Sequence, residues 1–283
     1  MANYRCMEAM LLHGGYAPVP RRRMLWEDKM DCRNMLVADA IRRDDLEAVM
    51  KALHFCDNAN LDPQDGFFKV RPIFNNLNRN STRWFSDQQR YSVDEVMIPY
   101  YGRHSAKQFI RGKPIRYGYK AWAICTADGC GVHFEPYCGR HTNIADVGLG
   151  QGPNVVLDLV QKAHLPAGSE VFFNNLFTTF PLLDKISERG IAGTGTVRQN
   201  RLHKVPIASK KNVLKKLVER GFQETLYKGD QVLACWKDNM PVYVASNKYS
   251  STRTNTVGRF CRTERKKIQV KSSELYTFFY NYM

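Results

Sequence analysis

The sequence predicts a mixed α/β fold with a helical region at its N-terminus and an α+β insertion after the core. Three observations support this prediction. Residues 1–86 are mostly helical in periodicity, residues 87–200 alternate β-rich with helical segments, and residues 201–260 hold short β-rich segments after a basic helix. The last segment, 261–283, is expected to begin a return of the chain to the core.

Helical periodicity is clearest between Met35 and Leu53. Apolar residues recur there at spacings of one, three and four, and the stretch contains no Gly or Pro. It ends at a cluster of turn-forming residues, 57–63. We expect a second short helix over 70–78, with Pro72 in its first turn.

The core segment predicts three strands, a helix, a strand, a helix and a final strand. These elements are strands 90–99, 117–126 and 132–137, helix 154–163, strand 169–174, helix 180–189 ended by Gly190, and strand 192–197. Ala127-Asp128-Gly129 supplies the turn of a β-hairpin. This order predicts a mixed sheet in which strand 169–174 lies parallel to strand 90–99 and is covered by helices.

After residue 200 the pattern predicts a separate α+β insertion. It would comprise a basic helix over 210–220 and short strands at 224–227, 232–236 and 241–246. Residues 248–259 are rich in Ser, Thr and Asn and are expected to form a loop.

The charge balance points to an anionic partner. The chain carries 42 Lys and Arg against 27 Asp and Glu, for a net charge of +15. A field of this sign attracts nucleic acid, although a membrane surface or no polyanion at all is also compatible with it. No apolar run is long enough to span a bilayer and no signal peptide is evident, so we expect no membrane association.

The eight cysteines predict reduced thiols in a cytosolic or nuclear protein. None forms a C-x-x-C pair, and they are scattered along a chain of 283 residues. Cys125, Cys130 and Cys138 lie close in sequence and leave open a zinc site, but their spacing matches no familiar finger. Neighbouring cysteines on a hairpin are the preferred interpretation.

Asp94 is the residue that most needs explanation. It lies within an apolar strand, where a carboxylate is costly to bury unless it is paired or binds a cation. The alternative is that it faces solvent on an edge strand. Strand 169–174 ends at Asn174, and parallel strands bring such positions side by side at the carboxyl edge of a sheet, where α/β proteins bind ligands. A pair of catalytic metal ions needs several converging carboxylates, and Asn174 brings no charge.

Several segments in the right order resemble the piggyBac transposase domain. They are Asp94-Glu95, 102–104, 108–120, the Asn174-Asn175-Leu176-Phe177-Thr178-Thr179 run, 193–198 and, in the helical region, 19–27. The resemblance covers the chain from about residue 7 to its end. More narrowly, the chain is similar to the piggyBac transposable element-derived proteins of vertebrates.

The resemblance implies an RNase H-like core with three metal-binding aspartates. It also implies that 1–86 is a helical dimerisation and DNA-binding region, that 87–200 is the transposase core, that 201–260 is an insertion domain, and that a Cys-rich domain follows the core. By position, the first aspartate is Asp94 and the second falls on Asn174. The third follows a Met-x-Gly-Val-Asp run, and the sequence ends at Met283 before it.

These departures predict a protein that is not an enzyme. We expect the chain to begin inside the helical region and to be truncated before the third aspartate. Asp94 and Asn174 would be vestigial positions, Asp94 at most a weak metal ligand, and the ancestral Mg²⁺ would not be retained as a cofactor.

A basic loop is the predicted DNA contact. Cations alternate there with the aromatic residues Phe109, Tyr117 and Tyr119, a pattern suited to a phosphate backbone, although a solvated loop anchored by its rings is the alternative. The candidate nucleic-acid-binding residues are Arg103, Lys107, Arg111, Lys113, Arg116 and Lys120. The runs 21–23 and 265–267 are candidate phosphate contacts or nuclear import signals, or plain solvated surface.

The preferred hypothesis is therefore a domesticated or decayed, catalytically inactive DNA-binding protein or fragment of the nucleus, for which a homodimer is one partner to test. One alternative is a longer form with Mg²⁺-dependent strand cleavage and transfer. The other is a protein-interaction scaffold that binds no DNA.

Overall fold

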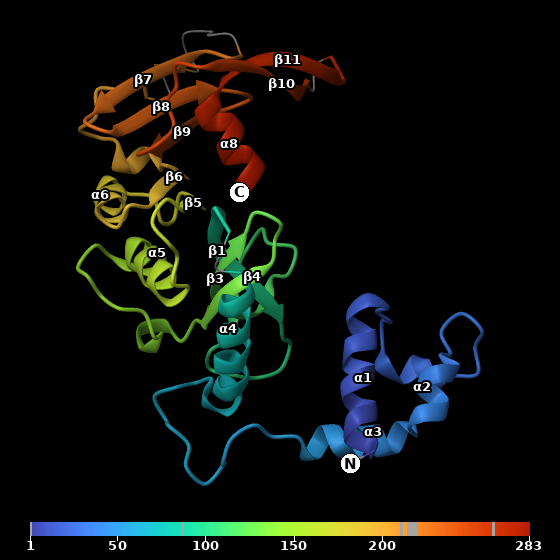
Figure 1. Ribbon diagram of the computed structural model, residues 1–283. Coiled ribbons are helices and arrows are strands. Elements are labelled where there is room, and N and C mark those ends of the chain that lie inside the picture. The colour runs from blue at the N-terminus through green and yellow to red at the C-terminus, as the bar shows by residue number, and fades with distance from the viewer. Residues whose placement is uncertain (1, 86–87, 210–211, 214–219, 262–263) are drawn as a thin grey trace. The chain divides into compact units, whose positions relative to one another are not determined.

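The computed structural model describes residues 2–85, 88–209, 212–213, 220–261 and 264–283. The chain divides into two compact units, Met1–Leu61 and Asp62–Met283 (Figure 1). Within the described ranges, every helix is too short or too polar to traverse a lipid bilayer.

The first unit is a small cluster of helices. They are α1 (Ala2–Tyr16), η1 (Arg22–Trp26), α2 (Met35–Ala40) and α3 (Arg43–Ala52). The core of the unit consists of Met7, Met10, Leu25, Val37, Ile41 and Leu46. The helical prediction between Met35 and Leu53 is confirmed, but the backbone is extended at Ile41 and Arg42, so the segment forms two helices instead of one.

Helix α4 (Arg71–Phe85) belongs to the second unit, where it follows η2 (Phe68–Val70) and packs against β4 (Gly131–Pro136). Pro72 lies in its first turn, where a missing N–H breaks no helical hydrogen bond. The helix predicted over 70–78 is confirmed and continues to Phe85. The predicted helical region 1–86 thus extends beyond the first compact unit.

One sheet runs through the second unit. β1 (Arg90–Pro99) pairs antiparallel with β3 (Tyr117–Thr126), which is flanked by β4 and by the short β2 (Gln108–Phe109). On its other side β1 pairs in parallel with β5 (Glu170–Phe173), and β5 in parallel with β6 (Ala192–Thr196). The predicted parallel pairing of strands 90–99 and 169–174 is confirmed.

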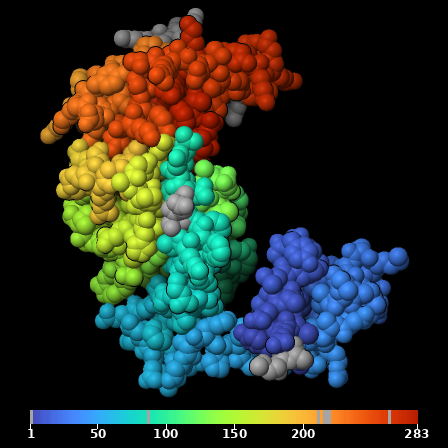
Figure 2. Space-filling model, viewed as in Figure 1, coloured from blue at the N-terminus to red at the C-terminus, as the bar shows by residue number. Residues whose placement is uncertain are grey.

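The strands predicted to form a separate insertion continue this sheet. β9 (Pro241–Ser246) pairs antiparallel with β6, and β8 (Gln231–Lys237) and β7 (Gln223–Lys228) follow it. The residues after 220, orange and red in Figure 2, lie directly beside the yellow residues, and β9 is paired with β6. The expected separation was wrong because edge pairing by backbone hydrogen bonds leaves no mark in the side-chain pattern. The domain boundaries themselves stay a prediction.

Helices cover both faces of the sheet. Phe172 and Phe173 point to opposite faces, as successive strand residues must. Phe173 contacts the core shared with α5 (Gln151–Lys162) and α6 (Phe180–Glu188), whereas Phe172 contacts α8 (Glu274–Tyr282). Helix α6 begins where the Thr179 side chain accepts a hydrogen bond from the Leu182 N–H, and it ends before Gly190, as predicted.

The C-terminal part differs from the predicted loop. Residues 248–259 were expected to lack regular structure, but β10 (Thr254–Cys261) begins there and pairs antiparallel with β11 (Lys266–Ser273). The side chains of β10 are exposed or half-buried, so polar residues occupy both of its faces and no apolar alternation appears. The helix predicted over 210–220 falls mainly on 210–211 and 214–219, which lie outside the described residues.

Candidate functional site

The end of β5 brings Asn174 beside Asp94 of β1. The parallel register pairs Val93 with Phe173, so the next residue of each strand lies at the same point of the sheet. Asn174 Nδ2 donates a hydrogen bond of 2.6 Å to Asp94 Oδ1. The sequence predicted this juxtaposition from the parallel arrangement of the two strands.

The orientation of the Asn174 amide is set by a second hydrogen bond. Its Oδ1 accepts from the Leu176 N–H at 2.8 Å. A backbone N–H can only donate, so the oxygen must face Leu176 and the nitrogen must face Asp94. The N–H group, not the carbonyl oxygen, is therefore presented to the carboxylate.

The loop after β5 is held in place by Arg201. Its Nη2 donates to the Leu176 carbonyl at 2.9 Å and its Nη1 donates to the Thr178 carbonyl. The Thr178 hydroxyl in turn donates to the Asn174 carbonyl at 3.0 Å. These contacts position the amide of Asn174 against Asp94.

Charge around Asp94 is partly compensated by Glu95 and Lys113. Burial, together with a hydrogen bond to the Glu95 side chain, raises the pKa of Asp94 to about 6. Burial also acts on Glu95, but hydrogen bonds from Asp94 and from Lys113 outweigh it and lower the Glu95 pKa. The Lys113 ammonium lies 3.1 Å from Glu95. The Asp94 carboxylate is thus easily protonated, and the Glu95 carboxylate is already ion-paired with Lys113.

These groups do not fit a pair of magnesium ions. Mg²⁺ needs oxygen ligands, and closely spaced divalent ions need several carboxylates to offset their repulsion. Asp94 Oδ1 instead accepts two N–H donors, from Asn174 and from the Glu95 backbone at 2.8 Å. Within the described part of the chain, no three His, Cys, Asp or Glu side chains are placed to hold a metal ion.

Three of the six predicted DNA-contacting cations are exposed. Arg103, Arg111 and Arg116 lie on the segment that leads into and out of β2. Beside them Phe109 and Tyr117 are 56% and 47% exposed, with their ring centroids 4.8 Å apart. Arg111, Arg116 and these two exposed rings therefore belong to one hairpin, an arrangement suited to phosphate contact and base stacking.

The other three cations make contacts within the fold. Lys107 Nζ donates to the Gly102 carbonyl at 2.8 Å, and Lys113 pairs with Glu95. Lys120 is half-buried, and burial lowers its pKa. Its ammonium lies 4.0 Å and 3.6 Å from the ring centroids of Trp122 and Tyr137. Such a cation–π cage stabilises the charge inside the protein rather than offering it to a phosphate.

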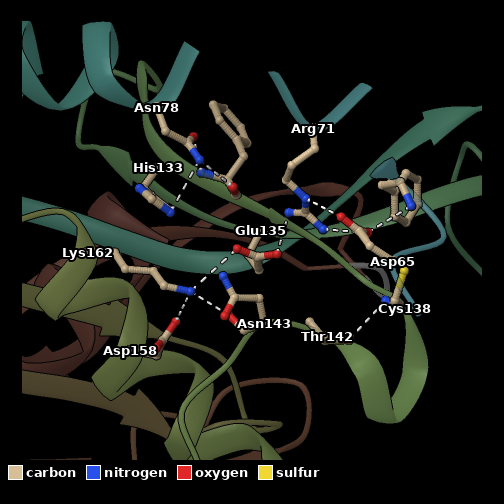
Figure 3. A network of polar contacts seen from close by, with 12 residues as sticks. Asp65, Arg71, Asn78, His133, Glu135, Cys138, Thr142, Asn143, Asp158 and Lys162 are labelled. Carbon is tan, nitrogen blue, oxygen red and sulfur yellow. Dashed lines mark hydrogen bonds and ion pairs between the residues drawn. The ribbon is translucent and has the colours of Figure 1, made fainter. Parts of the chain in front are cut away.

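A second polar cluster was missed by reasoning from the sequence. The Glu135 side chain of β4 is only 4% exposed and lies 2.9 Å from Arg71 Nη1 and 3.5 Å from Lys162 Nζ (Figure 3). Arg71 is also bonded to Asp65 at 2.7 Å, and Lys162 to Asp158 at 2.8 Å. The charged residues come from four separate segments, and only the tertiary fold brings them together. No local sequence motif therefore predicts the cluster.

Comparison with known proteins decides the family. The model of the family described as Transposase IS4 matches residues 5–283. The chain belongs to this piggyBac-type transposase family. The resemblance noted in the sequence is therefore confirmed.

The relatives include two human proteins. The chain is 40% identical over 286 residues to PiggyBac transposable element-derived protein 3, covering 100% of this chain and 48% of that protein. It is 35% identical over 276 residues to PiggyBac transposable element-derived protein 2, covering 96% and 46%. The chain thus spans about half the length of the curated relatives that it matches.

A solved structure supports the fold. The piggyBac transposase in its synaptic complex with hairpin DNA superimposes with a TM-score of 0.74 at 18% identity, over 99% of this chain and 56% of that one. The mixed α/β fold is therefore of the RNase H-like type, with β1 and β5 as the strands that carry Asp94 and Asn174.

Proposed function

We propose that this piggyBac-type chain is a transposase-derived DNA-binding protein that does not cleave DNA. The observation that carries the proposal is the 2.6 Å hydrogen bond from the Asn174 amide to Asp94. It places a neutral donor on one of the two oxygens through which Asp94 could coordinate a catalytic metal ion.

The physical reason is the charge and polarity of the groups at the ends of the two strands. Metal-assisted phosphoryl transfer depends on cations that activate the attacking oxygen and stabilise the leaving one. At this site an N–H donor faces the carboxylate, and Glu95 is neutralised by Lys113. Removing one carboxylate of such a site lowers rates by orders of magnitude, and here the replacement also points its donor at the remaining one.

Support for DNA binding comes from the exposed hairpin and the net charge of +15. Arg103, Arg111 and Arg116 are exposed, and the last two lie on the hairpin that carries the exposed rings of Phe109 and Tyr117. A structurally similar transposase is known in complex with hairpin DNA. Contacts of this kind neutralise phosphates without reading bases, so binding by this chain would be salt-sensitive and weakly specific.

A nuclear location and self-association belong to the same proposal. The basic runs 21–23 and 265–267 are exposed, as an import signal must be, although Arg23 is paired with Glu47 at 2.6 Å. A green fluorescent fusion of the chain, with and without Arg265→Gln and Lys267→Gln, tests the location. Sedimentation of the chain tests whether it forms a homodimer.

Two assays separate the components of the proposal. In a plasmid-nicking assay with Mg²⁺ or Mn²⁺, the chain and its Asp94→Ala variant should both be inactive. Nicking by the chain that Asp94→Ala abolishes would overturn the catalytic part. In a gel shift on nonspecific duplex, binding should appear at low salt and weaken at moderate salt. The absence of any shift at low salt would exclude DNA binding and favour a protein-interaction scaffold.

A further inference from the structure

A polar groove lies beside the Glu135 cluster, away from Asp94. It has a volume of about 760 Å³ and is formed by α4, β4, and the end of α5 with the residues around it. All of its lining side chains are polar or charged, among them Asn75, Asn78, Arg79, Arg83, Lys162 and His164. Pockets for ordinary small molecules are mainly apolar, so a groove of this composition suits a strongly hydrated, charged ligand.

The floor of the groove is rigid. Asn78 is 8% exposed, and its amide makes two hydrogen bonds of 2.8 Å with the backbone of Phe134, one as donor and one as acceptor. Glu135 holds Arg71 of α4 and Lys162 of α5 against β4 (Figure 3). The floor is therefore held in place by contacts within the protein, which reduces the ordering cost of binding.

The floor charges compensate one another. Among the described residues that line the groove, Glu135 is the only carboxylate, and it is ion-paired with Arg71 and Lys162. Asp65 and Asp158 bind the same two cations from behind. Burial, with the Lys162 charge, lowers the pKa of His133 to about 4, so this imidazole is neutral at physiological pH.

The uncompensated positive charge comes from Arg79 and Arg83. Both are exposed and both line the groove, one helical turn apart on α4, which separates them by about 6 Å along the helix axis. Arg79 donates to the Asn76 side chain at 2.7 Å, and the Arg83 guanidinium lies 5.7 Å from the Trp84 ring centroid. Within the described part of the chain neither has a carboxylate partner. Two guanidinium groups that no carboxylate of the described residues pairs, over a polar floor, match the planar, bidentate recognition of phosphate oxygens.

We propose that the groove between α4 and α5 binds phosphate groups, with Arg79 and Arg83 as the cations that contact them and Asn75 as a neutral donor beside them. The phosphate belongs either to a nucleic-acid backbone or to a free polyphosphate. The nucleic-acid source rests on the proposed DNA binding and makes the groove a second contact surface, separate from the hairpin of Arg111 and Arg116.

The test compares Arg79→Gln/Arg83→Gln with a matched control, Arg140→Gln/Arg253→Gln. Both double variants lose two exposed guanidinium groups, but the control residues do not line the groove. Pyrophosphate binding to the chain is measured by calorimetry, and binding of a short labelled duplex by fluorescence anisotropy over a range of salt concentrations. Circular dichroism and thermal unfolding verify that each variant is folded.

We expect the groove variant to lose roughly tenfold or more in pyrophosphate affinity while the control keeps it. If DNA is the source, the groove variant also binds duplex more weakly, and the slope of log affinity against log salt falls by about 0.9 for each lost phosphate contact. Pyrophosphate binding lost in the groove variant, with no duplex binding by any form, supports a free polyphosphate and refutes only the proposed DNA binding. Unchanged affinity of the folded groove variant for both probes overturns the inference, as does an equal loss in the control.

Discussion

At the scale of single residues, Asn174 determines what the strand ends can do. An aspartate at this position would place two carboxylates against each other and require a cation between them. The asparagine replaces that requirement with a direct hydrogen bond to Asp94 and a second one to the Leu176 N–H. This hydrogen bond joins the ends of β1 and β5 directly.

Asn174→Asp should make the fold depend on divalent metal. The change removes the donor to Asp94 and introduces carboxylate repulsion, which should lower the free energy of unfolding by about 1–3 kcal/mol in the absence of metal. Thermal unfolding with and without Mn²⁺ measures this, and Mn²⁺ should restore part of the loss. Asn175→Asp is the control, because Asn175 is exposed and its side chain already accepts from Arg198 at 2.8 Å. Equal stabilisation of the unmodified chain by Mn²⁺ would refute the interpretation.

Asp94 should also make stability depend on pH. Its pKa is raised to about 6 in the folded chain, above the ordinary value of 3.8. The folded state therefore holds the proton more tightly, so the stabilising contribution is full below about pH 4 and is lost as the pH rises through about 6. Because the side chain is partly exposed, we expect a loss of about 1–2 kcal/mol. Asp94→Asn should flatten this part of the stability curve, measured as the unfolding temperature across the same pH range. An identical pH profile in the variant would contradict the assignment.

At the scale of elements, the Gly193-Thr194-Gly195 stretch explains how closely β5 and β6 pack. A Cβ at Gly195 would lie 2.6 Å from the Phe173 carbonyl oxygen and would also clash with the Thr178 hydroxyl. The glycine therefore allows β6 to approach the loop that carries Asn174. Gly195 belongs to the 193–198 segment that resembles the family, and the packing of β5 against β6 requires a glycine at this position.

Gly195→Ala should accordingly destabilise the core. Overpacking of this kind typically costs about 1–3 kcal/mol, and backbone atoms at the clash leave little room for relief. Gly258→Ala is the matched control, since a Cβ there meets nothing within 4 Å. Urea unfolding of both variants gives the comparison. A Gly195→Ala variant as stable as the Gly258→Ala variant would show that the strands can separate without cost.

Glu135 of β4 is ion-paired with residues of α4 and α5, so its removal should weaken the packing of all three elements. Glu135→Ala would leave Arg71 and Lys162 partly buried without this partner, and breaking a buried ion pair costs about 3–5 kcal/mol. The remaining bonds to Asp65 and Asp158 should place the effect at the lower end. Glu188→Ala, which breaks the exposed pair with Lys185, should cost about 0.5 kcal/mol or less. Similar unfolding midpoints for the two variants would refute the role of Glu135 in joining α4, β4 and α5.

The order and pairing of the core strands could be predicted because period-two patterns and turn residues are local signals. The parallel neighbourhood of Asp94 and Asn174 followed from strand order and the handedness of crossovers. Three features could not be predicted. The pairing of β9 with β6 depends on backbone hydrogen bonds. Strand β10 has no apolar face that would mark it as a strand. The orientation of the Asn174 amide is set by the Leu176 N–H, which no sequence pattern encodes.

At the scale of the whole molecule, what matters is how the net charge of +15 is distributed. Many of the cations are neutralised within the fold, as Arg71, Lys113 and Lys162 are. The exposed cations that remain include Arg111 and Arg116 of the hairpin. Counting basic residues in the sequence therefore overstates the number of phosphates the chain can contact.

The salt dependence of DNA binding should report this difference between exposed and engaged cations. Arg111→Gln/Arg116→Gln should lower the slope of log affinity against log salt by about 1.8, because each lost phosphate contact contributes about 0.9 for duplex DNA. Lys120→Gln should leave the slope unchanged, since its ammonium lies within 4.0 Å of two aromatic rings, and should instead lower the unfolding temperature. Anisotropy titrations of one duplex at several salt concentrations give the slopes. If Lys120→Gln lowered the slope equally, the lysine would have to leave its two aromatic rings to reach DNA. The charge available for binding would then depend on rearrangement of side chains on contact, and not on the fold of the free chain.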